Sequence, residues 1–225
     1  MNPYSVSSET ARVLANLVLR EGCTRVLEFG AGVSSVVFAA VLEARGGGSL
    51  TSLEQNPEWC RDLWARVERA AGVEATLIAS DIGVTIDPRG VFYGWKARDE
   101  IRRHGPFDLV FVDAPWVDYG RDGSLHACAD RIRPGGWVVL DDAARKKERR
   151  VLRRWLAGYP GFRLVALDDR VGRGVAVLRK FESGRRPAWH RRVGLWLDGL
   201  YDMARSVRSV RRHERERPER VPDAG

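Results

Sequence analysis

The stretch RVLEFGAGVSSVVF, residues 25–38, decides how the rest of the chain is interpreted. Its opening tripeptide, RVL, is a short apolar run of the kind that forms a buried parallel strand. Gly30, Ala31 and Gly32 then form a tight turn into a helix that begins near Val33. Glycine accepts unusual backbone angles and lets a ligand approach the main chain, while the first N–H groups of the helix can hold a polar or anionic group. We therefore expect a ligand at this turn.

The residues around the turn narrow the class of ligand. Nicotinamide, flavin and S-adenosylmethionine (SAM) proteins all use a glycine-rich turn after a strand. Here Ser34 and Ser35 replace the third glycine of the dinucleotide fingerprint, and Glu28 lies two residues before the first glycine. A carboxylate at that place attracts a cation, such as the amino end of SAM, and repels a pyrophosphate. The alternative is that Glu28 is only a solvated strand end.

Length and composition describe a globular protein. The chain has 225 residues, of which 44% are hydrophobic and 30% charged, enough for one sizeable α/β domain and an appendage. No run approaches the roughly 18 apolar residues that span a membrane. The N-terminal sequence MNPYSVSSET lacks the regions of a secretion signal, and the three cysteines are scattered without metal-binding spacing. These features predict a cytoplasmic protein.

The rest of the domain alternates strands and helices. Apolar runs near residues 49–53, 75–78, 107–113 and 137–140 predict buried strands, and helical patterns lie between most of them. Residues 81–105 give no clear pattern. The last two strands, near 162–167 and 174–178, are joined by a connection too short for a parallel crossover, so they must pair as an antiparallel hairpin. The fold class is therefore α/β, with a mostly parallel, Rossmann-like sheet, helices on both faces and one reversed strand.

The formal charge of +8 is concentrated after the domain. Residues 184–225 contain 11 arginines and 6 acidic residues, a net charge of +5. We divide the chain into a domain at 1–183, a basic amphipathic helix at 184–212 and a disordered tail at 213–225. The helix carries an apolar stripe formed by Trp189, Val193, Trp196, Leu200, Ala204 and Val207.

Three interpretations of this helix compete. It packs on the domain or on a second subunit of a homodimer, or it binds an acidic membrane surface, or it binds nucleic acid. Nucleic acid is the least favoured partner, because the domain itself shows no basic face.

Acidic or polar side chains follow five successive strands of the predicted sheet. Ligands of open parallel sheets bind at these carboxyl ends. Glu54 lies 24 positions after Gly30, where a carboxylate can accept both hydroxyls of a ribose. Ser80 and Asp81 end the third strand and are placed to meet an adenine edge. The remaining acidic residues at strand ends are Glu28, Asp113, Asp141 and Asp142.

The succession LEFGAGVSS, LEQNPEW, LIASDIG, FDLVFVDAP and RPGGWVVLDDA resembles the class I SAM-dependent methyltransferases over about residues 7–180. Within that class it is most similar to the small metal-dependent O-methyltransferases, of the catechol type and of bacterial natural-product synthesis. The resemblance implies an enzyme with a seven-stranded sheet, a methyltransferase domain at 1–183 and SAM as cofactor. The residues expected to bind SAM are Glu28, Gly30, Ala31, Gly32, Ser34, Glu54, Gln55, Ser80, Asp81 and Asp113.

The same resemblance implies a metal site. Asp113 would be the first ligand, and Asp141 and Asp142 would supply the others. Three converging carboxylates repel one another unless a cation lies between them, and oxygen ligands suit Mg²⁺. Such an ion would lower the pKa of an acceptor hydroxyl and hold it in line with the methyl group. The alternative is that Asp142 caps the following helix.

A general base is harder to identify. The histidine or lysine that usually follows the first metal ligand in these enzymes is absent from the sequence Ala114-Pro115-Trp116. Asp118 and Tyr119 are the catalytic candidates besides Asp113, and His126 is a further nearby candidate. The acceptor pocket should be lined by two irregular loops, residues 92–95 and 116–121, whose aromatic residues could equally be a plug over the core.

These observations favour an enzyme that transfers a methyl group from SAM to an oxygen of a small hydroxylated or carboxylated metabolite, with Mg²⁺ as a candidate second cofactor. The alternatives are an RNA or protein methyltransferase that uses the basic tail, a non-catalytic SAM-binding partner protein, and a nicotinamide-linked oxidoreductase. The sequence leaves the acceptor open, because acceptor loops vary freely on one fold.

Overall fold

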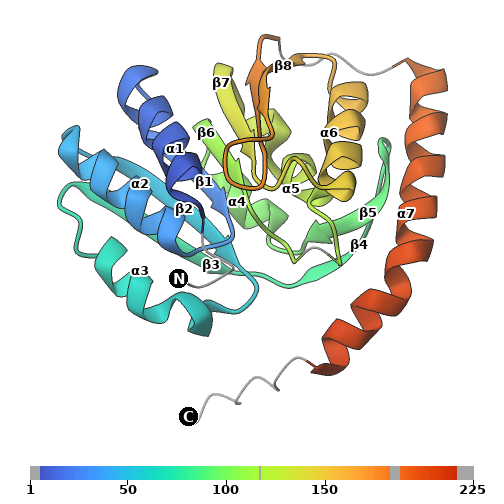
Figure 1. Ribbon diagram of the computed structural model, residues 1–225, viewed down its shortest axis with the longest axis horizontal. Coiled ribbons are helices and arrows are strands. Elements are labelled where there is room, and N and C mark those ends of the chain that lie inside the picture. The colour runs from blue at the N-terminus through green and yellow to red at the C-terminus, as the bar shows by residue number, and fades with distance from the viewer. Residues whose placement is uncertain (1–5, 117, 183–187, 217–225) are drawn as a thin grey trace.

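The computed structural model describes residues 6–116, 118–182 and 188–216, and its centre is a seven-stranded sheet in the order β3-β2-β1-β6-β7-β9-β8 (Figure 1). Its strands are β1 (Arg25–Phe29), β2 (Gly48–Glu54), β3 (Val73–Ala79), β6 (Phe107–Val112), β7 (Ile132–Leu140), β8 (Phe162–Asp168) and β9 (Val175–Lys180). The helices are α1 (Ser8–Arg20), α2 (Val33–Ala44), α3 (Arg61–Val67), α4 (Arg98–His104), α5 (Asp122–Cys128), α6 (Lys146–Gly158) and α7 (Trp189–Glu216), with short 3-10 turns at Pro57–Cys60 and Ala129–Arg131.

The direction of the strands confirms the predicted fold class. β3, β2, β1, β6 and β7 are parallel to their neighbours, whereas β9 runs antiparallel to both β7 and β8. The chain builds outward from β1 to β3 on one side and from β6 onward on the other. The strand order therefore reverses between β1 and β6, which is where ligands of such sheets bind.

Helices cover both faces of the sheet and enclose two apolar cores. On one face α1, α2 and α3 pack over Val26, Leu50 and Phe111 (Figure 1). On the other face α4, α5 and α6 pack over a second cluster that includes Leu27 and Val110. Because side chains alternate along a strand, β1 sends Leu27 to one core and Val26 to the other. A strand buried on both faces is continuously apolar, and this explains why these strands were visible in the sequence.

Residues 81–105, which gave no clear pattern, form a separate antiparallel hairpin followed by α4. Its strands are β4 (Ile82–Asp87) and β5 (Gly90–Trp95). β5 is buried against α5 and α7, whereas β4 leaves Val84 and Ile86 exposed. Residues 92–95 are therefore part of a strand and not the irregular loop that we predicted, and this strand covers the core. Their place in an acceptor pocket stays a prediction.

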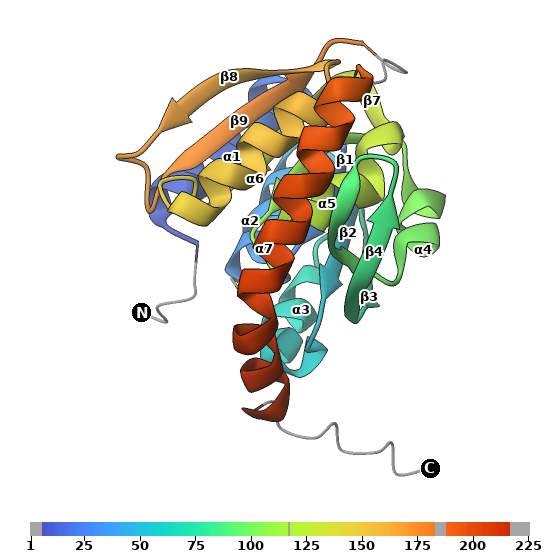
Figure 2. The same cartoon turned by 90° about the vertical axis from the view of Figure 1, so that its right-hand side faces the viewer.

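The helix after the domain, α7, packs alongside α6 and β5 (Figure 2). Its inner face buries Leu195 and Val210, and a Cβ atom on Gly199 would come within 2.4 Å of the carbonyl oxygen of Val91. The predicted apolar stripe is largely on the other side, because Trp189 is 77% exposed and Val193 is 52% exposed.

α7 extends four residues into the segment predicted to be a disordered tail, and residues 217–225 lie outside the described residues. Contact of α7 with a second subunit or a membrane surface stays a prediction. Among the described helices, α7 included, none combines the length and apolarity of a membrane span.

Candidate active site

The glycine turn after β1 has the close packing that the sequence predicted. Gly30 has a φ of +100°, and a Cβ atom on it would lie 2.9 Å from Cβ of Ala114. Its N–H donates to the carbonyl oxygen of Leu53 at 2.8 Å, which fixes the turn to the neighbouring strand. A Cβ atom on Gly32 would meet no heavy atom within 4 Å. The turn is thus tight at its first glycine and open at its last, where a ligand can approach the backbone.

Glu28 is fully buried behind this turn, which excludes the alternative that it is only a solvated strand end. Its Oε2 accepts hydrogen bonds from the hydroxyls of Ser35 at 2.5 Å and Ser52 at 2.7 Å. Ser35 also accepts the N–H of Gly32 at 2.9 Å, so the carboxylate shapes the turn through this serine. Burial raises the pKa of Glu28 to about 7, although hydrogen bonds from Ser34, Ser35 and Ser52 oppose the rise.

The second oxygen of this carboxylate, Oε1, makes no hydrogen bond with any described residue. A buried carboxylate oxygen that lacks a hydrogen bond is stabilised when a ligand donates one to it, and a ligand ammonium group also offsets the negative charge of the carboxylate. The site therefore fits a cofactor with a cationic amino end, as SAM has.

The neighbouring strand ends hold the other predicted cofactor residues together. The N–H of Ser80 donates to the carbonyl oxygen of Glu54 at 3.0 Å, so the ends of β2 and β3 lie side by side. Glu54 is partly exposed and accepts the N–H of Asn56 at 2.9 Å, while Asp81 and Gln55 are also partly exposed. Ser80 is buried, and its hydroxyl accepts the N–H of Ala97 and donates to the carbonyl of Asp81. Ser80 thus supports the loop, whereas Glu54 and Asp81 are the members open to a ligand.

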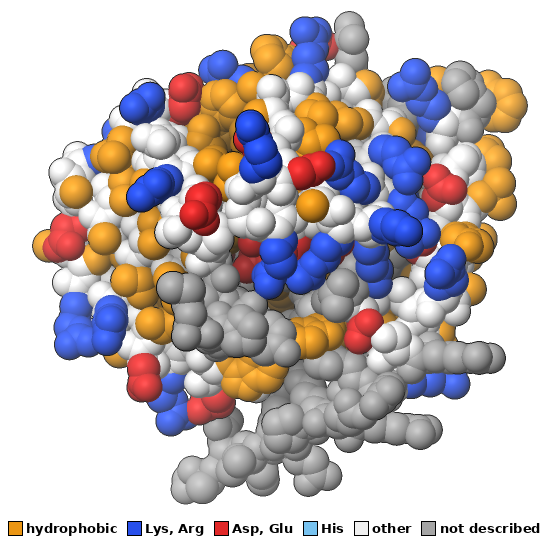
Figure 3. Space-filling model, viewed as in Figure 1, with side chains coloured by type: hydrophobic (Ala, Val, Ile, Leu, Met, Phe, Trp, Pro, Cys, Tyr) orange, Lys and Arg blue, Asp and Glu red, His pale blue; other side chains and the backbone are white. Residues whose placement is uncertain are grey.

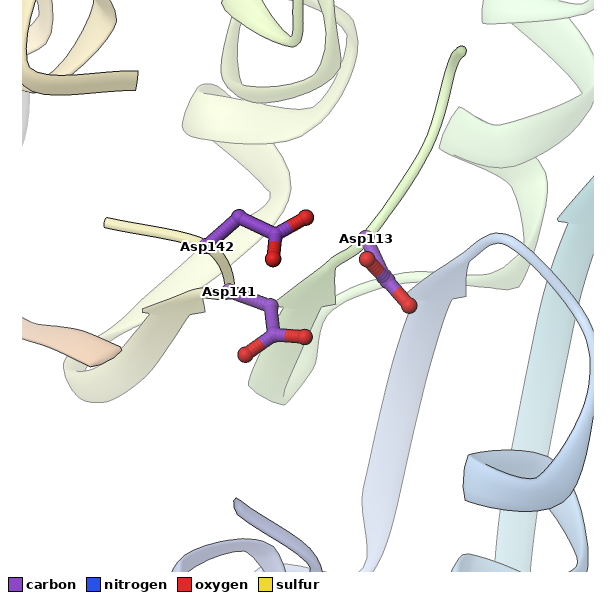
Figure 4. Close-up of side chains that lie close together, drawn as sticks. All are labelled: Asp113, Asp141 and Asp142. Atoms are coloured by element: carbon purple, nitrogen blue, oxygen red, sulfur yellow. The ribbon is translucent and has the colours of Figure 1, made fainter. Parts of the chain in front are cut away.

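Three aspartates meet at the ends of β6 and β7, as the sequence predicted (Figure 4). Oxygen atoms of Asp113, Asp141 and Asp142 lie within 4.8 Å of one another. The paired ends of Val112 and Leu140 bring the two strand ends together. Asp113 is the most open of the three, with 19% of its side chain exposed, whereas Asp142 has 1%. Helix α6 begins only at Lys146, so Asp142 is not its N-cap, and that alternative is wrong.

Arginine side chains neutralise this cluster, and the sequence did not predict them there. Arg121 is buried, and its Nη2 donates to Asp113 Oδ1 at 2.7 Å and to Asp142 Oδ2 at 2.8 Å. Its Nη1 donates to the carbonyl oxygen of Asp141 at 2.7 Å. Arg145 Nη1 lies 2.9 Å from Asp142 Oδ2, and Arg173 donates to the other oxygen of Asp142.

Lys and Arg side chains gather across the middle of the face in Figure 3, over recessed acidic side chains. Arg121 lies in the loop before α5, Arg145 precedes α6, and Arg173 belongs to the turn before β9. These three segments are far apart in the sequence, and no local pattern links them to the aspartates.

The arginines set the charge states of the aspartates. Burial raises the pKa of Asp113 to about 7, against the opposing effect of Arg121. Burial and the charge of Asp142 raise the pKa of Asp141. Burial also works against the charge of Asp142, but Arg121, Arg173 and Arg145 hold its pKa below the usual value. The arginines therefore favour the anionic form of Asp142, whereas burial favours the protonated form of Asp113.

A divalent cation does not fit between these carboxylates as they are arranged. Mg²⁺ shared by Asp113 and Asp142 would lie about 2.1 Å from an oxygen of each. Nη2 of Arg121 already bridges the same two carboxylates, so the ion and the guanidinium exclude each other. The residues predicted as metal ligands do converge, and Arg121 bridges two of them in this arrangement. Binding of Mg²⁺ at this cluster stays a prediction.

The other base candidates have partners elsewhere. Asp118 Oδ1 accepts the hydroxyl of Ser209, 2.5 Å away in α7. Tyr119 is 7% exposed and packs edge-on to Tyr93. These contacts engage both side chains on the α7 side of the site, and their catalytic role stays a prediction.

His126 belongs to the core. It stacks on Phe92 at 4.0 Å between ring centroids, its Nδ1 lies 2.7 Å from the hydroxyl of Tyr159, and burial lowers its pKa well below the usual value. A neutral, enclosed imidazole of this kind supports the packing of α5 and α6.

Known proteins share this fold and part of this sequence. A family model described as a methyltransferase domain matches residues 27–143. Demethylmacrocin O-methyltransferase of Streptomyces fradiae is 35% identical over 60 residues, which are 27% of this chain and only 12% of that protein.

Three solved structures are similar over most of their length. The O-methyltransferase TomG from Streptomyces achromogenes, involved in tomaymycin synthesis and solved with SAM, has a TM-score of 0.57 and 21% identity over 81% of this chain and 84% of its own. Cofactor-bound Rv0187 from MTB has a TM-score of 0.58 and 25% identity over the same shares. An O-methyltransferase from Bacillus cereus, solved with S-adenosylhomocysteine (SAH), has a TM-score of 0.57 and 20% identity over 79% and 84%.

The family match includes the glycine turn, Glu54 and all three aspartates. Together with the strand order and the buried Glu28, it establishes that the chain belongs to the methyltransferase-domain family and is a class I SAM-dependent methyltransferase.

Proposed function

We propose that this enzyme transfers the methyl group of SAM to an oxygen atom of a small-molecule acceptor. The observation that carries the proposal is the position of Asp113, whose carboxyl group is partly exposed. The next residue, Ala114, packs against the glycine turn at Gly30. Its pKa of about 7 suits a group that removes a proton from a hydroxyl at neutral pH. The relatives named O-methyltransferases support the choice of oxygen.

The chain contributes binding, orientation and one proton transfer. The glycine turn and Glu28 hold the amino-acid end of the cofactor, Glu54 accepts the ribose hydroxyls, and Asp81 meets the adenine edge. SAM supplies the electrophilic methyl group. Bound SAM would give up its methyl group and leave as SAH, while Asp113 would take the proton of the acceptor hydroxyl. Arg121 fixes the orientation of the Asp113 carboxylate.

Binding of SAH to the purified chain is the first test. We expect saturable heat in a calorimetric titration, and a loss of affinity of about tenfold or more in Glu54→Ala, because a hydrogen bond to a charged group contributes about 1.5–3 kcal/mol. Glu74→Ala, which removes an exposed carboxylate on β3, is the control and should bind SAH normally. Absence of SAH binding to the wild-type chain would overturn the cofactor assignment.

Product analysis then tests the acceptor class. Incubation with SAM and a panel of hydroxylated and amine-bearing small molecules should give O-methyl products by mass spectrometry. Asp113→Asn should reduce kcat by about 10²-fold or more, with a smaller loss of SAH affinity. Transfer only to amines, RNA or protein would refute the proposal.

The packing of α7 decides how the alternative function, an RNA or protein methyltransferase, can be tested. Deletion of residues after 183 would uncover β5, since Leu195 and Gly199 of α7 pack against that side of the domain. Reversal of the exposed charges at Arg191 and Arg192 is a cleaner test. A small-molecule enzyme should keep its activity in that double variant, whereas an enzyme that holds RNA through α7 should lose it.

A further inference from the structure

The guanidinium of Arg121 lies between the carboxylates of Asp113 and Asp142, where a cation shared by these two aspartates would lie. One nitrogen, Nη2, bridges Asp113 and Asp142, and the other donates to the backbone carbonyl of Asp141. Only 4% of the residue is exposed to solvent. This is the coordination of a built-in cation, and it differs from an exposed arginine that pairs with one acid.

The backbone and neighbouring charges hold Arg121 in this position. Its carbonyl oxygen accepts the N–H of Ser124 in the first turn of α5. The next residue, Asp122, pairs with Arg154 Nε at 3.1 Å, which fixes the start of α5 to α6. Glu148 of α6 is buried, neither of its carboxylate oxygens has a hydrogen-bond partner in the described chain, and its charge acts on Arg121. The guanidinium is thus attracted from two sides.

The charges of the site are nearly matched by the chain itself. The carboxyl groups of Asp113, Asp141, Asp142 and Glu148 face the three guanidinium groups of Arg121, Arg145 and Arg173. A bound divalent ion would add two positive charges beside these arginines. Buried charges are tolerated when they are paired, and the guanidinium of Arg121 already pairs with the two carboxylates that such an ion would share.

We propose that Arg121 replaces the divalent metal in this enzyme: it is a permanent organic cation that orders the aspartates and excludes Mg²⁺, so that methyl transfer needs no metal. The inference builds on the proposed function. Arg121 is a positioning residue, since it acts on the acceptor through Asp113.

Metal binding in the full chain tests this inference without turnover. Mn²⁺ is the probe, because the free ion gives an electron paramagnetic resonance signal that is lost on binding. The wild-type chain should leave Mn²⁺ free at millimolar concentration. Arg121→Met removes the charge and keeps much of the side-chain volume, and it should bind Mn²⁺ at least about tenfold more tightly, since Asp113 and Asp142 then lack the cation that they share. Adding Asp142→Asn to Arg121→Met should remove the gained site.

Thermal unfolding gives a second readout that a purely structural arginine would not produce. Arg121→Met should have a lowered Tm that Mn²⁺ partly restores, because a ligand that binds only the folded state stabilises it. The Tm of the wild-type chain and of Arg121→Lys, which keeps a cation, should not respond to Mn²⁺.

Two results would overturn the inference. One is wild-type binding of Mn²⁺ that Asp142→Asn removes, and this experiment does not depend on whether Arg121→Met folds. The other is a folded Arg121→Met that binds SAH but gains no Mn²⁺ affinity. SAH binding is measured on the same samples, so failure of the metal inference is distinguishable from failure of the methyltransferase assignment.

Discussion

Replacement of Glu28 by glutamine should make the protein more stable and less able to bind its cofactor. Burial raises the pKa of Glu28 from 4.5 to about 7, so the folded chain holds this proton more tightly than the unfolded chain. The stability that the carboxyl group contributes is present below pH 4.5 and is lost as the pH rises through 7. A shift of this size corresponds to about 3 kcal/mol lost by pH 8. Glutamine does not titrate, and its carbonyl oxygen can still accept the hydroxyls of Ser35 and Ser52.

Chemical unfolding of the wild-type and Glu28→Gln chains at several pH values between 4 and 8.5 measures the effect. The variant should gain relative to the wild type as pH rises, up to about 3 kcal/mol, or an increase in Tm of about 6–12 °C for a chain of this size. SAH affinity should fall about tenfold, because the ammonium loses its anionic partner. Stability and binding thus change in opposite directions.

Glu74→Gln removes an exposed carboxylate from β3 and supplies the control, for which we expect no comparable gain. All other titrating groups are common to the two chains, so the difference between them reports Glu28 alone. A stability difference that stays constant between pH 4 and 8 would show that the carboxylate is not buried as described. An unchanged SAH affinity would show that Glu28 does not contribute to the cofactor site.

Two further predictions concern glycines. Gly30→Ala should weaken SAH binding at least about tenfold and destabilise the fold by about 1–3 kcal/mol, because its Cβ would lie 2.9 Å from that of Ala114 at a φ of +100°. Calorimetry measures the SAH affinity and thermal unfolding measures the stability. An unchanged Kd for SAH would contradict the tight turn. Gly199→Ala should loosen α7 at a cost of about 1–3 kcal/mol, because its Cβ would come within 2.4 Å of the Val91 carbonyl oxygen. Limited proteolysis should then remove α7 faster than in the matched control Gly194→Ala, whose Cβ meets nothing within 4 Å, and equal cleavage rates would argue against this packing.

The sheet and the cofactor end of the site could be predicted because their signals are local. A strand such as Phe107–Val112 is buried on both faces and is apolar at every position but Asp108, and a carboxylate at its end follows from the sequence directly. The separate hairpin of β4 and β5 could not be predicted in the same way. β4 exposes Val84 and Ile86 and buries only Asp87, so its apolar residues do not mark the buried face.

The orientation of α7 shows a second limit of prediction from the sequence. Its sequence offers more than one apolar face, and the aromatic stripe that begins at Trp189 was the more conspicuous. The face that packs is instead marked by Leu195, Gly199 and Ser206, which are buried or closely packed. At Gly199, β5 leaves no room for a larger side chain. A close contact made through glycine has no hydrophobic signature in a sequence.

The position of Arg121 shows a third limit of prediction from the sequence. The three aspartates were recognisable from their positions at strand ends, but the arginine that neutralises them comes from the loop before α5 and crosses to β7. Tertiary packing alone brings these charges together. Three carboxylates at strand ends indicate a metal site in the sequence, whereas the arginine beside them is visible only in the structure.

The charges beneath the site connect it to α7. Asp202 of α7 pairs with Arg150 at 3.1 Å and with Arg154, which in turn pairs with Asp122, the residue after Arg121. The ribosome makes α7 after every strand of the sheet, so a nascent chain can form the sheet while this ion-pair network still lacks its last member. We expect β1, β2 and β3, with the glycine turn, to fold first. The segment around Arg121 and Asp122 should become rigid only when α7 has been released. Nascent chains cut off before Asp202 should therefore be the form on which chaperones and proteases act.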